Sequence, residues 1–535
     1  MSQKEDERED FFVNRAGQGQ VPAAIGGPRE MSEERPEISQ KVNMAEGKPQ
    51  RTKRVSVLVA LCLALTGAAS AAPPASSPPA PSKKSPVSSV SSVDTLVTAA
   101  HVVTMDAADS VFSPGAVAIK GGAIVAVGAP SDLLRHYSPK HRISRPHSIV
   151  LPGLINTHTH AAMNLLRGIA DDLPLKDWLT KFIFPAEGRN VSPLFVKAGT
   201  LLACAEMVRG GTTTFADMYY FESDVASAVD QCGMRAVLGE TWLDFPVPDH
   251  KDLAESIAVT RAFLEKWKGH PRIIAAVAPH APYTNAKESL QAAKALADEF
   301  HAPLLIHLSE TRDEQRELAE KYGRTPTNWL ESIGFLGPNV LAAHFVWCDA
   351  DDLRLLSERH VGLAHNPESN MKLADGVAPV VAARRVGIAV GLGTDGAASN
   401  NDLDMWEAMD FAGKLAKVST MDPTVLPAKD LLRMATIEGA RAMKLDGKIG
   451  SLERGKRADL VAVDLVRAGT APVWDLFSTL VYVVKESDVS LTMVEGRVLW
   501  NGTRVTTLDE ASVVRDAEVW RKRIAASLAA PAAPK

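Results

Sequence analysis

The chain has 535 residues and a net charge of −5, from 59 lysine and arginine residues against 64 aspartate and glutamate residues. This length exceeds that of one ordinary domain of about 100–200 residues, and the acidic balance argues against a nucleic-acid polymer as a partner, because such proteins usually carry a basic face. Four cysteines exclude a disulfide scaffold, and 46% hydrophobic with 23% charged residues is the composition of a soluble globular protein with a large core.

The first 71 residues are predicted to lie outside the folded protein. Residues 1–54 combine ten acidic with ten basic residues and show almost no apolar periodicity, which is typical of a disordered segment. Residues 55–67 (VSVLVALCLALTG) form an apolar run with a basic flank before it and small residues up to Ala71 after it. This pattern predicts a secretory signal peptide ending near Ala71, and Met44 opens a conventional one. We therefore expect an exported protein, periplasmic or extracellular, with no stable membrane span after cleavage; the alternative is an uncleaved anchor, although the run is shorter than the roughly 20 apolar residues of a spanning helix.

Two β-rich segments lie at opposite ends of the predicted folded part, after a linker over 72–92 that is rich in Pro, Ser and Ala. Residues 93–150 contain β-rich runs around Gly121-Gly122, and residues 446–505 contain another pair around Glu495-Gly496. Such pairs are hairpin signals. We expect the two segments to join in one small β-sandwich.

The middle of the chain, residues 151–445, alternates short apolar strands with longer amphipathic runs such as Lys287–Phe300. Alternation of this kind predicts βα units and a parallel sheet. Eight candidate strands end at 156–158, 215–218, 237–241, 275–280, 304–310, 340–345, 361–366 and 390–395. The predicted fold class is therefore α/β, a (β/α)8 TIM barrel with a small β-sandwich domain built from both chain ends, followed by a C-terminal helix and tail over 506–535.

Histidines stand at the ends of several predicted strands, at the face where barrel enzymes place their active sites. His158 and His160 are two residues apart, so in extended backbone both point to one face; this pair alone fits a surface loop equally well. His307, His344 and Asp395 close three further strands. A lone strand histidine is more often a core residue, but ligands at four strand ends are the nitrogen and oxygen donors that zinc or a similar divalent ion takes.

Other polar residues near these strand ends are candidates for the chemistry. Glu310 lies three residues after His307, where a carboxyl group can carry a proton between a metal-bound water and the substrate; the alternative is a glutamate stabilised by the dipole of a following helix. His280 and Glu187 are candidates for contacts with the polar groups of the substrate. Trp178 is a candidate for stacking on a base, or it belongs to a helix core.

Five motifs in chain order carry a resemblance to a known family: LPGLINTHTH (151–160), APHAPYT (278–284), HLSET (307–311), AHNPESNMKLADGVAPV (364–380) and GLGTDGAASNN (391–401). Together they resemble the amidohydrolase superfamily. More narrowly, they are similar to its 5-methylthioadenosine/S-adenosylhomocysteine deaminase family, which is related to the triazine chlorohydrolases. The resemblance covers roughly residues 94–505.

The resemblance implies roles for individual residues. It implies that one zinc ion per chain, with iron or manganese as alternatives, is bound by His158, His160, His307 and Asp395. It also implies catalytic roles for three residues: Glu310 as the proton shuttle, His344 as the histidine that orients the metal-bound water, and Asp395. His280 and Glu187 match substrate-contacting positions, with Glu187 as the partner of the ribose hydroxyls.

One departure from the family pattern concerns the substituent of the substrate. Where relatives that accept homocysteine carry an arginine, this chain has Gly239-Glu240-Thr241. We expect Glu240 to repel a carboxylate tail unless Lys251 or Arg261 compensates. This departure favours a substrate with a neutral tail.

The combined prediction is a zinc-dependent hydrolytic deaminase of an adenine nucleoside of the 5-methylthioadenosine, adenosine or S-adenosylhomocysteine type, which releases ammonia and the inosine product. The first alternative is an aminohydrolase or chlorohydrolase of another heterocycle, such as guanine, a pterin or a triazine. The second is an exported binding protein with an inactive barrel, but such a protein should have lost a metal ligand or the shuttle, and none is missing. The expected partner is a small heterocyclic or nucleoside substrate, and a homo-oligomer is compatible with the sequence.

Overall fold

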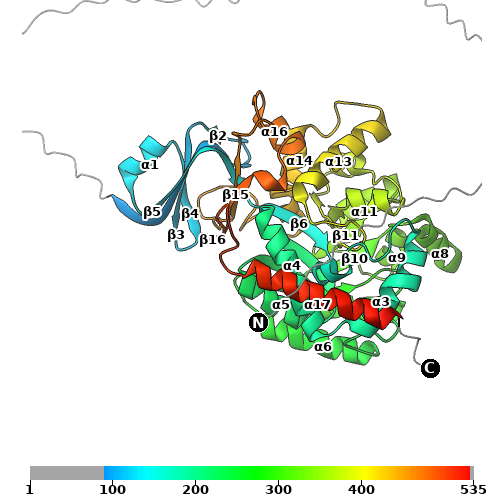
Figure 1. The fold of residues 1–535 in the computed structure, drawn as a ribbon. Helices are drawn as coiled ribbons and strands as arrows, with labels where there is room; N and C mark the ends of the chain where they lie inside the picture. The colour runs from blue at the N-terminus through cyan, green and yellow to red at the C-terminus, as the bar shows by residue number, and fades with distance from the viewer. Residues whose placement is uncertain (1–89, 530–535) are drawn as a thin grey trace, which may run out of the picture. The chain divides into compact units, whose positions relative to one another are not determined.

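An eight-stranded parallel barrel occupies the centre of the chain in the computed structural model, which describes residues 90–529 (Figure 1). Its strands are β6 (Leu154–Thr159), β7 (Thr212–Tyr219), β8 (Arg235–Trp242), β9 (Ile273–Pro279), β10 (Leu304–Leu308), β11 (Val340–His344), β12 (Gly362–His365) and β13 (Val390–Leu392). Neighbours in the sheet follow the order of the chain, and the paired strands run parallel. All eight predicted strands are present, which confirms the predicted fold class.

The first and last strands of the barrel are joined at their carboxyl ends. The backbone N–H of Asp395 donates to the carbonyl of His158 over 3.0 Å. One residue earlier on β6, the Thr157 hydroxyl donates to the carbonyl of Leu392 on β13 over 2.9 Å. These bonds close the barrel at the rim that carries the predicted ligands.

Helices cover the outside of the barrel, as the 3.6-residue periodicity of the intervening segments predicts. They are α2 (Leu175–Trp178), α3 (Phe184–Asn190), α4 (Pro193–Arg209), α5 (Glu222–Cys232), α6 (Leu253–Trp267), α7 (Lys287–Phe300), α8 (Arg312–Tyr322), α9 (Pro326–Ser332), α10 (Ala350–Glu358), α11 (Pro367–Lys372), α12 (Val380–Arg385), α13 (Met405–Thr420), α14 (Ala428–Met434) and α15 (Ile437–Ala442), with the short segments η1 (Ala161–Leu166) and η2 (Leu179–Ile183). The C-terminal helix α17 (Glu510–Ala529) packs across α3 and α4 (Figure 1).

A second sheet is built from both ends of the folded chain. It contains β1 (Ser91–Val103), β2 (Val111–Phe112), β3 (Gly115–Lys120), β4 (Ala123–Gly128), β5 (Tyr137–Pro152), β14 (Leu460–Asp464), β15 (Val489–Val494) and β16 (Arg497–Trp500). The two ends meet where β14 pairs antiparallel with β5. The remaining short helices are α1 (Pro130–His136), α16 (Leu476–Tyr482) and η3 (Glu486–Asp488). The sequence predicted a small sandwich from these segments, and the strands form one continuous sheet.

This sheet curls so that its distant strands share one core. The N–H of Ile124 on β4 donates to the carbonyl of Lys456, just before β14, over 2.8 Å. Apolar side chains of β3, β4, β14 and β15 pack together in one buried cluster. A buried ion pair then ties the sheet to the barrel, because Arg235 at the start of β8 lies 3.1 Å from Asp459 and 3.2 Å from Glu495.

Two predictions concern the beginning of the folded part. Strand β1 begins at Ser91, so the predicted linker over 72–92 extends two residues too far. The predicted signal peptide lies outside the described residues, and export stays a prediction. Within residues 90–529, no single helix is long and apolar enough to cross a membrane. Two consecutive helical segments with a bend between them, 175–190 and 193–209, together have the length and composition of a spanning segment, and only these two properties suggest one.

Candidate metal centre and active site

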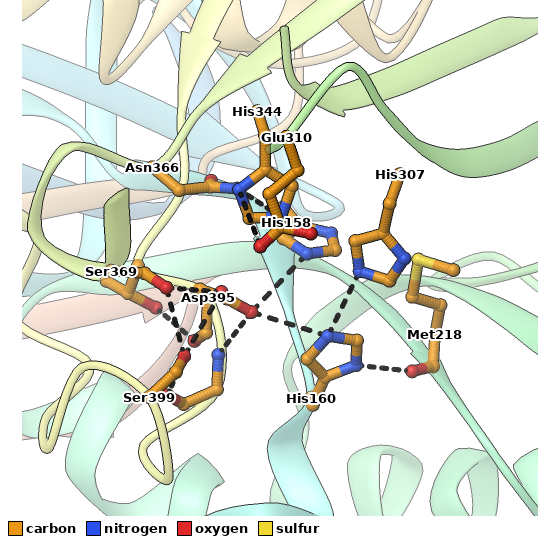
Figure 2. A network of polar contacts seen from close by, with 12 residues as sticks. His158, His160, Met218, His307, Glu310, His344, Asn366, Ser369, Asp395 and Ser399 are labelled. Atoms are coloured by element: carbon orange, nitrogen blue, oxygen red, sulfur yellow. Dashed lines mark hydrogen bonds and ion pairs between the residues drawn. The ribbon is translucent and has the colours of Figure 1, made fainter. Parts of the chain in front are cut away.

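The predicted metal ligands converge at the carboxyl rim of the barrel (Figure 2). His158 lies near the end of β6 and His160 directly follows that strand. His307 lies in β10, and Asp395 follows β13. Because the carboxyl ends of parallel barrel strands meet at one rim, residues from three separate strands come together there.

The spacing of the ligand atoms matches a tetrahedral metal site. Asp395 Oδ1 lies 3.4 Å from His158 Nε2 and 3.3 Å from His160 Nε2. His307 Nε2 lies 3.4 Å from His160 Nε2. Bonds of about 2.0–2.1 Å to a tetrahedral zinc ion place its ligand atoms about 3.3–3.4 Å apart. His158, His160 and Asp395 therefore form a set that could hold a divalent metal ion, and His307 adjoins this set through His160.

The protonation of two histidines supports a cation between them. His160 Nδ1 lies 2.7 Å from the carbonyl of Met218, and His307 Nδ1 lies 2.8 Å from the carbonyl of His280. A carbonyl oxygen only accepts, so both Nδ1 atoms carry the hydrogen, and the two Nε2 atoms face each other with lone pairs. A divalent cation between them removes this repulsion, and backbone carbonyls commonly orient metal-binding histidines in this way.

The buried ligands are held in their deprotonated forms. Burial lowers the pKa of His158 to about 4, and burial with the neighbouring histidines lowers the pKa of His307 well below its usual range. Burial acts to raise the pKa of Asp395, but its hydrogen bond with His158 and the other histidines beside it hold this pKa well below its ordinary value. Metal binding needs neutral imidazole and ionised carboxylate, and these shifts favour those forms of His158, His307 and Asp395.

Hydroxyl groups fix the orientation of the Asp395 carboxylate. Its Oδ2 accepts hydrogen bonds from Ser369 Oγ at 2.7 Å and Ser399 Oγ at 3.1 Å. Its Oδ1 accepts from the N–H of Gly396 at 2.7 Å and points toward His158 and His160 (Figure 2).

Glu310 and His344 lie beside the proposed ligands. His344 Nδ1 donates to Asn370 Oδ1 over 2.9 Å, and its Nε2 lies 3.4 Å from Asn366 Nδ2. Glu310 Oε1 lies 3.7 Å from His344 Nδ1. Burial, and then the negative charges of Asp395 and Glu314, raise the pKa of Glu310 well above its ordinary value. This shift favours the protonated form of Glu310, which a carboxyl group that donates to a substrate needs.

One cavity brings these residues together with the predicted substrate contacts. Eight of the nine predicted site residues line it: Trp178, Glu187, His160, His280, His307, Glu310, His344 and Asp395. The ninth, His158, is buried beneath them. The rest of the wall is largely apolar and aromatic, from Met163, Leu175, Leu179, Ile183, Phe184, Met218, Tyr219, Tyr220, Thr241, Tyr283, Leu373 and Ser399. Apolar walls with a few convergent polar groups are typical of small-molecule sites.

The three predicted substrate contacts differ in their surroundings. Glu187 in α3 accepts a hydrogen bond from the Tyr219 hydroxyl over 2.7 Å, and burial raises its pKa to about 7. His280 Nδ1 lies 3.1 Å from Thr284 Oγ1, and burial with the nearby histidines lowers the pKa of His280 to about 3. Trp178 both packs in the core and faces the cavity, and its indole N–H has no partner among the described residues.

The expectation that Glu240 faces the substrate is wrong. A Cβ at the preceding Gly239 would meet Ala278 and Leu305, which belong to the barrel interior, so alternation along β8 turns Glu240 outward. Glu240 is buried, and its carboxyl accepts the N–H of Glu222 over 3.1 Å. Lys251 is exposed, and Arg261 pairs with Glu299 on the surface. Thr241 is the residue of this segment that lines the cavity.

Sequence reasoning missed several residues that hold the site. Ser369 and Asn370 lie within a recognised motif, but nothing local showed that they bond Asp395 and His344. Tyr219, the partner of Glu187, is the last residue of strand β7 and carried no signal. Glu314 followed a Thr-x-x-Glu pattern typical of a helix cap, which did not reveal its contact with the Glu310 backbone.

Residues 149–499 match the model of the amidohydrolase family. The chain belongs to the amidohydrolase family. Among curated amidohydrolase relatives, the 5-methylthioadenosine/S-adenosylhomocysteine deaminase 1 of Syntrophus aciditrophicus is 44% identical over 82% of this chain and 99% of its own length. The 5'-deoxyadenosine deaminase of Methanosarcina barkeri is 44% identical over 79% of this chain and 97% of its own.

Solved structures agree with this membership. A zinc-bound adenosine deaminase from Xanthomonas campestris is 38% identical, with a TM-score of 0.81 over 82% of this chain and all of its own. The atrazine chlorohydrolase of Arthrobacter aurescens shares the fold, with a TM-score of 0.74 and 23% identity over 80% of this chain and all of its own. The predicted superfamily and the prediction of a hydrolase are thereby confirmed.

Proposed function

We propose that this amidohydrolase is a hydrolytic deaminase of adenine nucleosides that uses one zinc ion bound by His158, His160, His307 and Asp395. The observation that carries the proposal is that the buried Glu310 lies in the same cavity as a converging set of histidine and carboxylate side chains. The names of relatives at 44% identity, deaminases of methylthioadenosine and deoxyadenosine, support the substrate class.

The residues of the cavity divide the reaction between them. When bound, zinc acts as a Lewis acid and lowers the pKa of a water ligand. Glu310 donates its proton to the ring nitrogen beside the attacked carbon, which makes that carbon more electrophilic. His344, held by Asn370, orients the attacking water through its Nε2. Water replaces the amino group of adenine, so the products are ammonia and the inosine nucleoside.

A screen for ammonia release tests the proposal. The zinc-loaded protein is assayed against adenosine, 5-methylthioadenosine, 5'-deoxyadenosine, S-adenosylhomocysteine, guanine and an aminotriazine. We expect the 5'-substituted adenosines to have the highest kcat/KM. Turnover of guanine or the triazine, with none of any adenosine, would contradict the proposal and assign the cavity to another heterocycle.

The structure gives no reason to restrict the substrate to nucleosides with a neutral substituent at the 5' carbon. Because Glu240 faces away from the cavity, it does not repel a carboxylate tail. An outer cavity adjoins the first at Leu175, Leu179 and Tyr283, and Arg312 lines it with its guanidinium 4.3 Å from the Trp347 ring centroid. This cation supports including S-adenosylhomocysteine among the substrates.

Replacing Glu187 by glutamine is expected to weaken binding of nucleosides but not of free bases. A hydrogen bond to a charged acceptor contributes about 1.5–3 kcal/mol, so loss of the ribose contact should raise KM for adenosines by about tenfold or more, with kcat little changed. Steady-state kinetics of ammonia release measures both constants. Free adenine, which has no ribose, serves as the internal control: an equal loss on adenine would show that Glu187 does not contact the sugar.

We also propose that the mature protein is exported and begins near residue 72. The support is the basic flank, apolar run and small-residue site of residues 51–71. Sequencing the N-terminus of the mature protein tests this proposal.

A further inference from the structure

The turn that carries Glu310 has an unusual backbone. It leads from β10 to α8, and its first residue, Ser309, lies in the left-handed region with φ 54°. Only glycine adopts this region without strain, so the turn needs support from its surroundings. Thr311 then caps α8, and its hydroxyl accepts the N–H of Glu314 over 3.1 Å.

Glu314 supplies that support from inside the helix. Its carboxylate oxygens accept the backbone N–H of Ser309 at 2.9 Å and of Glu310 at 2.8 Å. Glu314 is 2% exposed, so water does not replace these bonds. In an ordinary capping box the glutamate at this position bonds the N–H of the cap residue itself. Here it reaches past Thr311 to the two residues before it.

A second side chain of α8 holds the same turn. Gln315 Nε2 donates to Ser309 Oγ at 3.0 Å and to the carbonyl of Trp347 at 2.9 Å. Among the hydrogen bonds of the described residues, Glu310 contacts helix α8 only through its backbone N–H, which donates to Glu314. The N–H of Trp347 also donates to the carbonyl of Ser309 over 2.9 Å. Within this turn, the N–H of Glu310 itself is held by the Glu314 carboxylate.

We propose that Glu314 is the positioning residue of the proton shuttle: by accepting both amides of the turn, it sets where the Glu310 carboxyl group lies in the cavity. This inference rests on the role that the proposed function gives to Glu310. Loss of the carboxylate leaves two buried donors without a full partner, and the strained turn relaxes. A displacement of about 1 Å at a reacting group can lower a rate by about 100-fold.

The first test is Glu314→Gln, which keeps the shape of the side chain but turns an NH₂ group toward one of the two amides. We expect kcat per bound zinc to fall by about 10- to 100-fold, with KM for 5-methylthioadenosine within about twofold and with zinc content unchanged. Glu320→Gln makes the same chemical change at an exposed site on α8 and should leave kcat unchanged. If Glu314→Gln yields too little folded protein, Glu314→Asp retains the charge but is too short to reach both amides, and it should give the same pattern.

A double-variant cycle separates positioning from a general loss of structure. If Glu314 acts through Glu310, the chain with both Glu310→Gln and Glu314→Gln should be no slower than Glu310→Gln alone. Losses that multiply in the double variant, or full kcat per zinc in Glu314→Gln, would overturn the inference while leaving the proposed function in place. Full activity of Glu310→Gln would instead overturn the shuttle role on which the proposed function stands.

Discussion

Replacing His307 or Asp395 by alanine is expected to abolish both zinc binding and ammonia release. Each variant removes one member of the proposed ligand set, in which three pairs of ligand atoms lie 3.3–3.4 Å apart. His307→Ala also removes the Nε2 atom that faces Nε2 of His160, and with it the pair of nitrogen lone pairs that a cation would bind. Metal analysis of the purified protein measures its zinc content, and an ammonia assay measures its activity. Both should fall to the limit of detection together.

A control for these variants is His141→Ala, at an exposed position on β5 of the second sheet. It should keep its zinc and its full activity. The opposite result for the ligand variants, a metal-free chain that still releases ammonia, would show that the converging histidines are a structural cluster and that the reaction has another origin.

Replacing Glu310 by glutamine is expected to keep zinc in place and to lower kcat by about 10²- to 10⁴-fold, the range for a lost general acid or base. Glutamine has nearly the same shape but cannot release a proton to the substrate. Metal analysis and steady-state kinetics on one preparation test the two halves of the prediction. Activity close to that of the wild type would show that Glu310 does not transfer a proton and only precedes helix α8.

The raised pKa of Glu310 also predicts the direction of a pH effect. Burial and the charges of Asp395 and Glu314 raise the pKa of this carboxyl group and so favour its protonated form. The protonated form donates, so it is populated below the pKa of Glu310 and lost as pH rises through it. The alkaline fall of kcat in the wild type should therefore be absent from Glu310→Gln, and a fall that persists unchanged would assign it to another group.

The residues proposed as metal ligands could be found in the sequence because their signals are local. His158 and His160 are separated by the two-residue period of a strand, and His307 and Asp395 follow short apolar runs. Once the chain is recognised as alternating strands and helices, parallel pairing brings the ends of all strands to one rim without further information. The hairpin turns at Gly121-Gly122 and Glu495-Gly496 were predictable for the same reason, since all four residues have positive φ, which two-residue turns require.

The direction of Glu240 shows where such local reasoning stops. Strand β8 is buried on both faces, so its sequence lacks the polar and apolar alternation that would show which side chains point inward. Only contacts of Gly239 with side chains of β9 and β10 reveal the register. The charge that seemed to oppose a carboxylate tail lies outside the barrel, and the specificity argument changes with it.

The amino-acid sequence by itself determined the family and the barrel and indicated the candidate metal ligands and the acidic residue beside them, because periodicity and short motifs act over a few neighbouring residues. The tertiary structure alone decided that β5 and β14, from opposite ends of the chain, share one sheet, and that Tyr219 holds Glu187. It also decided that Glu314 reaches back to the amides of the Glu310 turn. These contacts form only when separate elements pack together and bury polar groups that then need a hydrogen-bond partner. No local sequence pattern shows which elements will pack in this way.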